Sequence, residues 1–152
     1  MESLFIEGNT KKAIAKVKKL LLFYPNSSLL FNIQGLLSSG LKNFDSALEN
    51  YDKAIEKNPN FVEPYFNKGN AMRDNGNLNS ALQCYKKAIK IKPDYAEVYN
   101  NMGNVFTDLG DFSSAVKSYR EAIKIKPEYA DTHYNLAVSL NDIGETTAAL
   151  KR

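Results

Sequence analysis

Residues 96–129 read AEVYNNMGNVFTDLGDFSSAVKSYREAIKIKPEY, and the pattern in this stretch predicts the fold of the whole chain. The pattern recurs at an unchanged spacing of 34 residues, which four prolines mark: Pro25, Pro59, Pro93 and Pro127. Self-similarity at a fixed period of this length is typical of repeat architectures. Aligned on the prolines, the chain contains three complete units, residues 28–61, 62–95 and 96–129. Residues 1–27 and 130–152 are partial units of the same array.

Other columns of the alignment agree as well as the prolines do. Counted from the first residue of each unit, place 4 is aromatic or histidine, place 8 is small, place 20 is alanine and place 24 is tyrosine in the complete units. The corresponding residues are Phe31, Tyr65, Tyr99 and His133; Gly35, Gly69, Gly103 and Ala137; Ala13, Ala47, Ala81, Ala115 and Ala149; and Tyr51, Tyr85 and Tyr119. We expect the small residues to let paired helices approach closely, with the aromatic side chains filling the gaps beside them.

Each unit predicts two antiparallel helices, A and then B. In residues 96–129 the apolar residues of both helices recur every three or four positions. Gly110 fits a left-handed helix end, as Gly76 and Gly144 do in their units. Asp111 can cap helix B, and Pro127 ends it. The predicted helices span residues 2–7, 10–23, 28–40, 44–57, 62–75, 78–91, 96–109, 112–125, 130–143 and 146–152.

This arrangement of an aromatic, a small residue, an Ala…Tyr…Ala series and a closing proline resembles the tetratricopeptide repeat over essentially the whole chain. The run Tyr99–Phe106 most resembles the repeats of O-linked N-acetylglucosamine transferases and their bacterial relatives. The resemblance implies an all-α, right-handed α-solenoid in which helix A lines a concave surface. Two features depart from the family. The place 4 aromatic is Tyr or Phe where Trp is common, and the last unit diverges through His133 and Thr146.

Composition indicates an ordinary folded protein. Hydrophobic residues make up 43% of the chain and its net charge is +3, which a solvated lysine-rich face explains as well as an anionic partner does. A single cysteine, the absence of a long apolar run and the absence of a signal-peptide layout favour a cytoplasmic protein that does not enter a membrane. Because neither end shows a polar capping element, we interpret the chain as a fragment, with any catalytic domain lying beyond Arg152.

The sequence predicts no enzyme, cofactor or metal site. His133 falls in the aromatic column, where a packing role is expected. Cys84 has no neighbouring His or Cys to activate it or to share a metal. Nucleic acid is not an expected partner, since the lysines lie on helix B without interleaved exposed aromatics or arginine clusters.

A column of asparagines is the strongest candidate for a binding site. Place 6 holds Asn67, Asn101 and Asn135, and place 9, on the same helical face, holds Asn70 and Asn104. An asparagine can accept from a peptide N–H and donate to a peptide C=O, so the column could hold an extended chain whatever its side chains. In the transferases that the chain resembles, asparagines in corresponding places have this role. Alternatively, the asparagines bond across units to rigidify the stack, or merely tolerate a helix near solvent.

Charge favours a neutral or basic partner. Places 2 and 13 are acidic, with Glu63, Glu97, Asp131, Asp74, Asp108 and Asp142, whereas the helix B ends are rich in lysine. Arg73 is the one cation expected on the concave side, so acidic C-terminal tails are disfavoured. The predicted groove residues are Asn67, Asn70, Asn101, Asn104, Asn135, Arg73 and Asp108.

The leading hypothesis is therefore a protein-interaction scaffold that binds an extended polypeptide. One alternative is the substrate-presenting arm of a larger enzyme, such as a glycosyltransferase. Another is a self-assembly scaffold, in which end faces that carry Ile143, Ala149 and Leu150 form a weak homo-oligomer.

Overall fold

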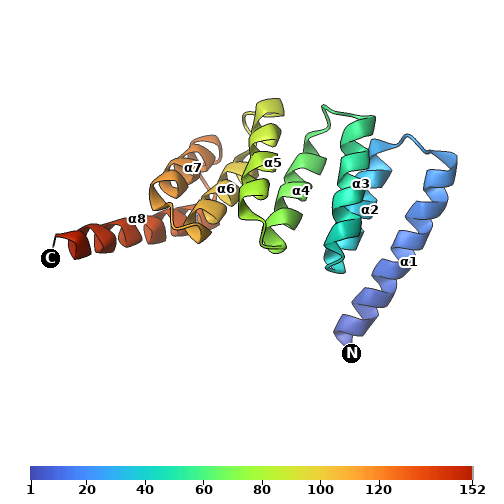
Figure 1. Ribbon diagram of the computed structural model, residues 1–152, viewed down its shortest axis with the longest axis horizontal. Coiled ribbons are helices and arrows are strands. Elements are labelled where there is room, and N and C mark those ends of the chain that lie inside the picture. The colour runs from blue at the N-terminus through green and yellow to red at the C-terminus, as the bar shows by residue number, and fades with distance from the viewer. Residues whose placement is uncertain (152) are drawn as a thin grey trace. The chain divides into compact units, whose positions relative to one another are not determined.

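The computed structural model describes residues 1–151, apart from the side chain of Ala149, and this range contains eight helices and no strand (Figure 1). The helices are α1 Glu2–Phe23, α2 Ser28–Gly40, α3 Phe44–Lys57, α4 Val62–Asp74, α5 Leu78–Ile91, α6 Ala96–Asp108, α7 Phe112–Ile125 and α8 Ala130–Leu150. The fold is an all-α solenoid of helical repeats, as the sequence predicts.

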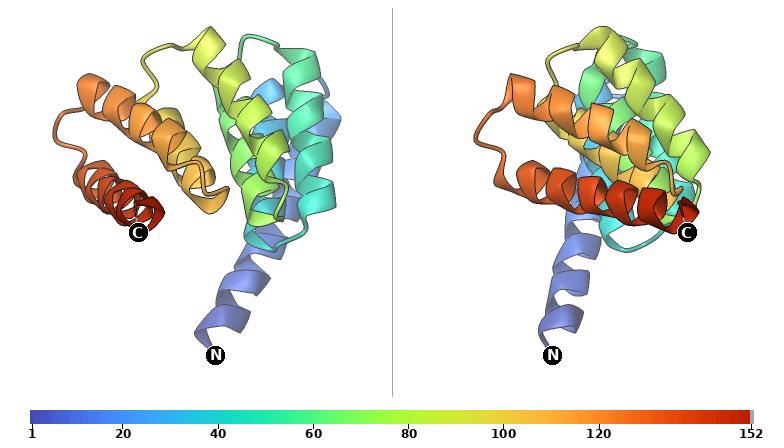
Figure 2. Two further views of the ribbon diagram at one scale, coloured as in Figure 1. Left: turned by 60° about the vertical axis from the view of Figure 1, so that its left-hand side comes forward. Right: turned by 90° about the vertical axis from the view of Figure 1, so that its left-hand side faces the viewer.

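The chain divides into two compact units, Met1–Cys84 and Tyr85–Arg152. In the first, α2 packs against α3 and also contacts α1 and α4, while α3 contacts α4. In the second, α6 and α7 form an antiparallel pair, and α8 packs against α7 and contacts α6 (Figures 1 and 2). In both units, therefore, a helix A contacts the helix A of the next repeat.

The internal helices begin and end within one residue of the predicted positions, because the turns and caps are as expected. Gly76 and Gly110 have positive φ angles of 84° and 76° at the ends of their helices. Lys42 occupies the same place with a φ of 58°, a conformation that is uncommon for a residue other than glycine. The side chains of Asn43 and Asp111 accept hydrogen bonds from backbone N–H groups in the first turn of α3 and α7.

The two predicted turns nearest the ends of the chain are wrong. Helix α1 continues through Gly8, and α8 continues through Gly144, so residues 2–7 and 146–150 extend these helices instead of folding back. In Figure 2 the first part of α1 projects beyond α2 and α3.

The physical reason lies two positions after each of these glycines. At place 17 of the repeat, Phe44 packs against the buried cluster of Ala47, Tyr51 and Ala71. The partial repeats at the two ends of the chain have Thr10 and Thr146 at this place. Both threonine hydroxyls donate to a carbonyl four residues earlier in the same helix, at 2.9 Å. Without an apolar side chain to bury, a turn gains nothing over a continued helix.

In the pairs α2–α3 and α6–α7, a glycine of helix A contacts a tyrosine of helix B. A Cβ added to Gly35 would lie 2.5 Å from Cε1 of Tyr51, and one added to Gly103 would overlap the ring of Tyr119. Both tyrosines are buried, as are the alanines at places 20 and 27 of these pairs. The small and aromatic columns therefore set the distance between helix A and helix B.

None of the helices in residues 1–151 combines the length and the apolar character needed to cross a bilayer.

Candidate functional site

Two of the predicted asparagines are brought together in the second unit. Asn135 of α8 donates from Nδ2 to Oδ1 of Asn104 on α6, at 3.2 Å, and the hydroxyl of Tyr119 donates to the same oxygen at 2.8 Å. A second hydroxyl, that of Thr107, lies 3.2 Å from the Tyr119 oxygen and 3.4 Å from Oγ of Ser139. Helices α6, α7 and α8 thus share one polar network.

This network leaves both asparagines with open hydrogen-bonding groups. The two lone pairs of Asn104 Oδ1 are occupied by Tyr119 and Asn135, so its Nδ2 group is the part that can still bond. Asn135 uses one of the two N–H groups of its Nδ2 atom, so its second N–H and its Oδ1 atom are both open. Within residues 1–151 no further bond of either side chain is found. The pair therefore presents amide N–H donors from both residues and one carbonyl acceptor, Oδ1 of Asn135.

The network forms the floor of a cavity of about 240 Å³ between α6, α7 and α8. Its other lining residues are Asp108, Tyr134 and Val138. Asp108 is exposed and pairs with no cation in the described part of the chain. Burial raises the pKa of Tyr119, and the negative charge of Asp108 adds to that increase. The carboxylate is therefore close enough to the floor to influence it.

The corresponding surface of the first unit is built differently. Asn67 of α4 donates from Nδ2 to Oδ1 of Asn32 on α2 at 3.0 Å, and Asn32 is only 5% exposed. At the place of Asn104, α2 has Leu36, and at the place of Asp108 it has Gly40. Here the asparagine amide serves the contact between neighbouring repeats, and no carboxylate lies beside it in sequence register.

The remaining predicted groove residues have partners of their own. The guanidinium of Arg73 lies 3.3 Å from the carboxylate of the adjacent Asp74, which reduces the positive charge it can present. Asn101 accepts from Nδ2 of Asn100 at 3.5 Å. Asn70 lies on α4, half-buried, three positions after Asn67.

Sequence reasoning missed the hydroxyl groups of this surface. Tyr119 was expected only to pack, yet its hydroxyl bonds to Asn104 as well. The tyrosine of the first unit has a comparable partner, since Tyr51 forms a hydrogen bond with Ser39, at the place of Thr107. A hydroxyl at place 12, opposite the tyrosine column, was the signal that could have revealed the network.

His133 has a structural contact that its column explains. Its Nε2 atom lies 2.7 Å from the carbonyl oxygen of Pro127, six residues earlier. Tyr65, in the same column, donates its hydroxyl to the carbonyl of Pro59 at 3.0 Å. The imidazole thus replaces a phenol as the group that ties helix A to the preceding proline turn. No group of three or more potential metal ligands occurs among the described residues.

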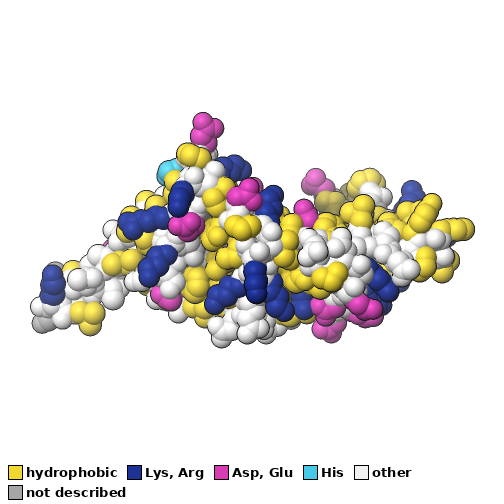
Figure 3. Space-filling model, turned by 90° about the horizontal axis from the view of Figure 1, so that it is seen from above, with side chains coloured by type: hydrophobic (Ala, Val, Ile, Leu, Met, Phe, Trp, Pro, Cys, Tyr) yellow, Lys and Arg dark blue, Asp and Glu magenta, His cyan; other side chains and the backbone are white. Residues whose placement is uncertain are grey.

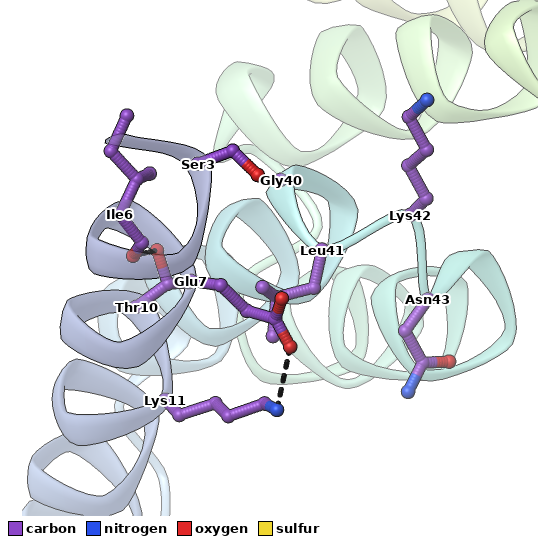
Figure 4. A pocket seen from close by; sticks show the side chains of 9 residues that line it. All are labelled: Ser3, Ile6, Glu7, Thr10, Lys11, Gly40, Leu41, Lys42 and Asn43. Atoms are coloured by element: carbon purple, nitrogen blue, oxygen red, sulfur yellow. Dashed lines mark hydrogen bonds and ion pairs between the residues drawn. The ribbon is translucent and has the colours of Figure 1, made fainter. Parts of the chain in front are cut away.

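A larger cavity, of about 590 Å³, lies beside the first half of α1, between Ser3 and Lys11 (Figure 4). Its walls are α1 and the turn between α2 and α3, with Leu41 and Lys42 on the turn side. On α1, Lys11 and Glu7 form an ion pair at 2.6 Å, and the hydrogen bond from Lys11 lowers the pKa of that carboxyl. Ser3 and Thr10 also line this cavity, and the hydroxyl of Thr10 donates to the carbonyl of Ile6.

Charge on the surface is mixed. Figure 3 shows lysine, arginine and carboxylate side chains interspersed over the face that it draws. Glu97, at acidic place 2, lies 3.5 Å from the ammonium of Lys126, so part of the acidic column is neutralised locally. Asp108 keeps its charge free of such a pair within residues 1–151.

Comparison with protein families gives matches along most of the chain. A family model described as TPR repeat matches residues 69–107 and again residues 103–144. Two models described as tetratricopeptide repeat match residues 50–83 and 30–61. No curated protein matches the chain.

Solved structures are similar in fold. A crystal structure of MamA has a TM-score of 0.83 and 24% identity, covering 95% of this chain and 84% of MamA. TTC0263, a thermophilic TPR protein in Thermus thermophilus, has a TM-score of 0.78 and 18% identity, covering 88% of this chain and 74% of its own. The first TPR of Spaghetti (RPAP3), bound to HSP90 peptide SRMEEVD, has a TM-score of 0.75 and 17% identity, covering 78% of this chain and 94% of its own.

Proposed function

The chain belongs to the tetratricopeptide repeat family, and we propose that it is a protein-interaction scaffold, without catalysis of its own, that binds an extended polypeptide along its helix A surface. The observation that carries this proposal is the pair of Asn104 and Asn135. Their mutual bond leaves amide N–H donors on both residues and an open carbonyl acceptor on Asn135, on neighbouring helices. A peptide backbone requires this combination, because every residue other than proline has one N–H and one C=O.

The internal bonds also favour binding by fixing the side chains beforehand. Ordering a flexible side chain on association costs free energy, and a side chain already held by its neighbours avoids much of that cost. Asn67 is held in this way by Asn32 and offers its Oδ1 atom. In this proposal the ladder of Asn67, Asn70, Asn101, Asn104 and Asn135 holds a peptide backbone, and Asn67, Asn104 and Asn135 also bond between repeats.

The partner that fits this surface is neutral or basic. The RPAP3 domain, similar in fold, is bound to a peptide that ends in EEVD. On this chain an acidic tail would meet the carboxylate of Asp108, and the guanidinium of Arg73 is paired with Asp74. The resemblance of the Tyr99–Phe106 run to transferase repeats supports holding through the backbone. That resemblance and the single, buried cysteine, Cys84, favour a cytoplasmic location.

The triple variant Asn67→Ala, Asn101→Ala, Asn135→Ala tests the ladder. A peptide selected from a random display library on the wild-type chain would be titrated into both proteins by calorimetry. Each neutral hydrogen bond contributes about 0.5–1.5 kcal/mol, so we expect the variant to bind roughly tenfold more weakly or worse.

The control is the double variant Asn60→Ala, Asn79→Ala, which removes exposed asparagines away from helix A and should bind normally. Melting curves of all proteins are needed, because Asn67→Ala leaves buried Asn32 without its donor, at a cost of about 1–3 kcal/mol. Unchanged affinity in a folded triple variant would show that the ladder is purely structural. Selection of acidic C-terminal peptides would contradict the partner class.

A further inference from the structure

We infer that the cavity between α6, α7 and α8 is a pocket for a single lysine or arginine side chain of the bound polypeptide. The inference rests on the proposed function and adds to it a specific position in the partner. Its volume of about 240 Å³ suits one long side chain rather than a folded segment. All of its lining residues belong to the second compact unit.

The walls of the pocket match the two parts of such a side chain. Tyr134 and Val138 lie one turn apart on α8, and their side chains are partly or largely exposed, Tyr134 by 71%. They can cover the aliphatic stem, and the tyrosine ring can also attract a cation. Asp108 supplies a carboxylate on the α6 side that has no cationic partner within residues 1–151.

The hydroxyl groups of the floor donate within the network, and the lining carries the negative charge of Asp108, so the pocket disfavours an anion. Tyr119 gives its proton to Asn104, and Thr107 gives its proton to the carbonyl of Gly103 at 3.0 Å. Ser139 can give its proton to Thr107, whose oxygen lies 3.4 Å away. The donors that remain open at the pocket are neutral groups, the amides of Asn104 and Asn135 and the hydroxyl of Tyr134. The open acceptors are Oδ1 of Asn135 and the carboxylate of Asp108, which carries a full negative charge. A group that donates several hydrogen bonds and carries positive charge is therefore complementary.

The pocket sets a register for the partner, because the first unit lacks its equivalent. In repeat register, Gly40 stands for Asp108, Phe66 for Tyr134, Asn70 for Val138 and Ala71 for Ser139. No carboxylate occurs in that set. A backbone held at several asparagines could slide by one or two residues, whereas a basic side chain seated beside Asp108 would fix its position.

The experiment is a selection of random ten-residue display peptides on three proteins: the wild type, Asp108→Asn and Asp74→Asn. Asp74 is the matched control, an exposed aspartate at the same place in the preceding repeat that is already paired with Arg73. We expect wild type and Asp74→Asn to enrich lysine or arginine at one fixed position, and Asp108→Asn to bind peptides without that preference. In the best wild-type peptide, changing the basic residue to norleucine should weaken binding about two- to fivefold, and 1 M NaCl should remove most of the difference.

The outcomes separate this inference from the proposed function. Peptides enriched without a basic position, or a basic position retained on Asp108→Asn, would overturn the pocket while the peptide scaffold stands. Loss of the preference on Asp74→Asn as well as on Asp108→Asn would also overturn it, since the effect would then be one of overall charge. Failure of the folded wild type to enrich any peptide would overturn the proposed function and the pocket with it.

Discussion

At the scale of single residues, the contact between glycine and tyrosine explains why the repeat keeps these two columns. The rings of Tyr51 and Tyr119 lie against the backbone of Gly35 and Gly103, where any side chain would collide with them. Gly40, by contrast, faces open space at the end of α2. Glycine is therefore required by packing at place 8 and not wherever it occurs.

Gly103→Ala should destabilise the protein by about 1–3 kcal/mol, because the added methyl group displaces a buried ring that has little room to move. Urea unfolding monitored by circular dichroism measures the change. Gly40→Ala is the control and should stay within about 0.5 kcal/mol of the wild type. Equal effects of the two substitutions would contradict the assigned contact.

Tyr51 provides a test by pH. Burial raises its pKa from 10.0 to about 12, opposed by its hydrogen bond with Ser39. The folded state therefore keeps a proton that the unfolded state loses near pH 10, so this contribution to stability is complete below pH 10 and declines between pH 10 and 12. Urea unfolding at pH 9 and at pH 11 should show a smaller loss of stability for Tyr51→Phe than for the wild type. The same loss in both proteins would contradict the raised pKa.

At the scale of helices, a glycine at place 15 of the repeat ends a helix in one repeat and lies inside a helix in another. Gly110 ends α6 with a positive φ, whereas Gly144, 34 residues later, lies inside α8. Glycine is compatible with both conformations. The choice depends on the residue two places on, Phe112 or Thr146, and on whether an apolar surface is available to bury it.

Alanine substitutions at these two glycines should have opposite signs. Gly110→Ala forces a side chain into the left-handed region, at a cost of about 1–2 kcal/mol. Gly144→Ala meets no atom within 4 Å and should stabilise α8 by about 0.5–1 kcal/mol. Thermal melts and far-ultraviolet circular dichroism report both effects. Loss of stability or helicity in Gly144→Ala would indicate that the chain turns at this position after all.

At the scale of the whole molecule, apolar side chains remain exposed in both units. In the first unit they lie at both ends of α1 and at the start of α2, and Figure 3 shows hydrophobic side chains gathered over α1. They include Leu4, Phe5 and Ile6 at the start of α1, and Leu22, Phe23, Tyr24 and Leu29 where α1 ends and α2 begins. On α8, Leu150 is exposed and Ile143 half-buried. Exposed apolar surface of this kind is typical of an interaction site.

We propose that the surface formed by Leu22, Phe23, Tyr24 and Leu29 mediates weak self-association. Sedimentation velocity should show a sedimentation coefficient that rises with protein concentration, and Leu22→Asp with Phe23→Asp should abolish the rise by placing charge in the contact. Lys18→Asp, an exposed change on the same helix, is the control for charge alone. A monomer at every concentration would contradict self-association, and association unaffected by the double variant would contradict its location.

The amino-acid sequence by itself determined the all-α fold, the positions of six internal helices and the packing columns. These features depend on periodic apolar residues, caps and prolines that act within one repeat, so they can be recognised without knowledge of the neighbours. The sequence also indicated that the asparagines and Asp108 are surface residues of helix A.

Only the tertiary structure decided how those surface residues are paired and where the turns at the two ends are lost. A hydrogen bond such as Asn135–Asn104 or Asn67–Asn32 joins side chains 31 or 35 residues apart, and its partner depends on the rotation of one helix against the next. The column alone predicts that the asparagines at place 6 are equivalent. In the structure, however, Asn67 donates to Asn32 at place 5, and Asn135 donates to Asn104 at place 9. At Gly8 and Gly144 the local signal permits both turn and helix, so burial of a neighbouring side chain, which is a tertiary property, determines the result.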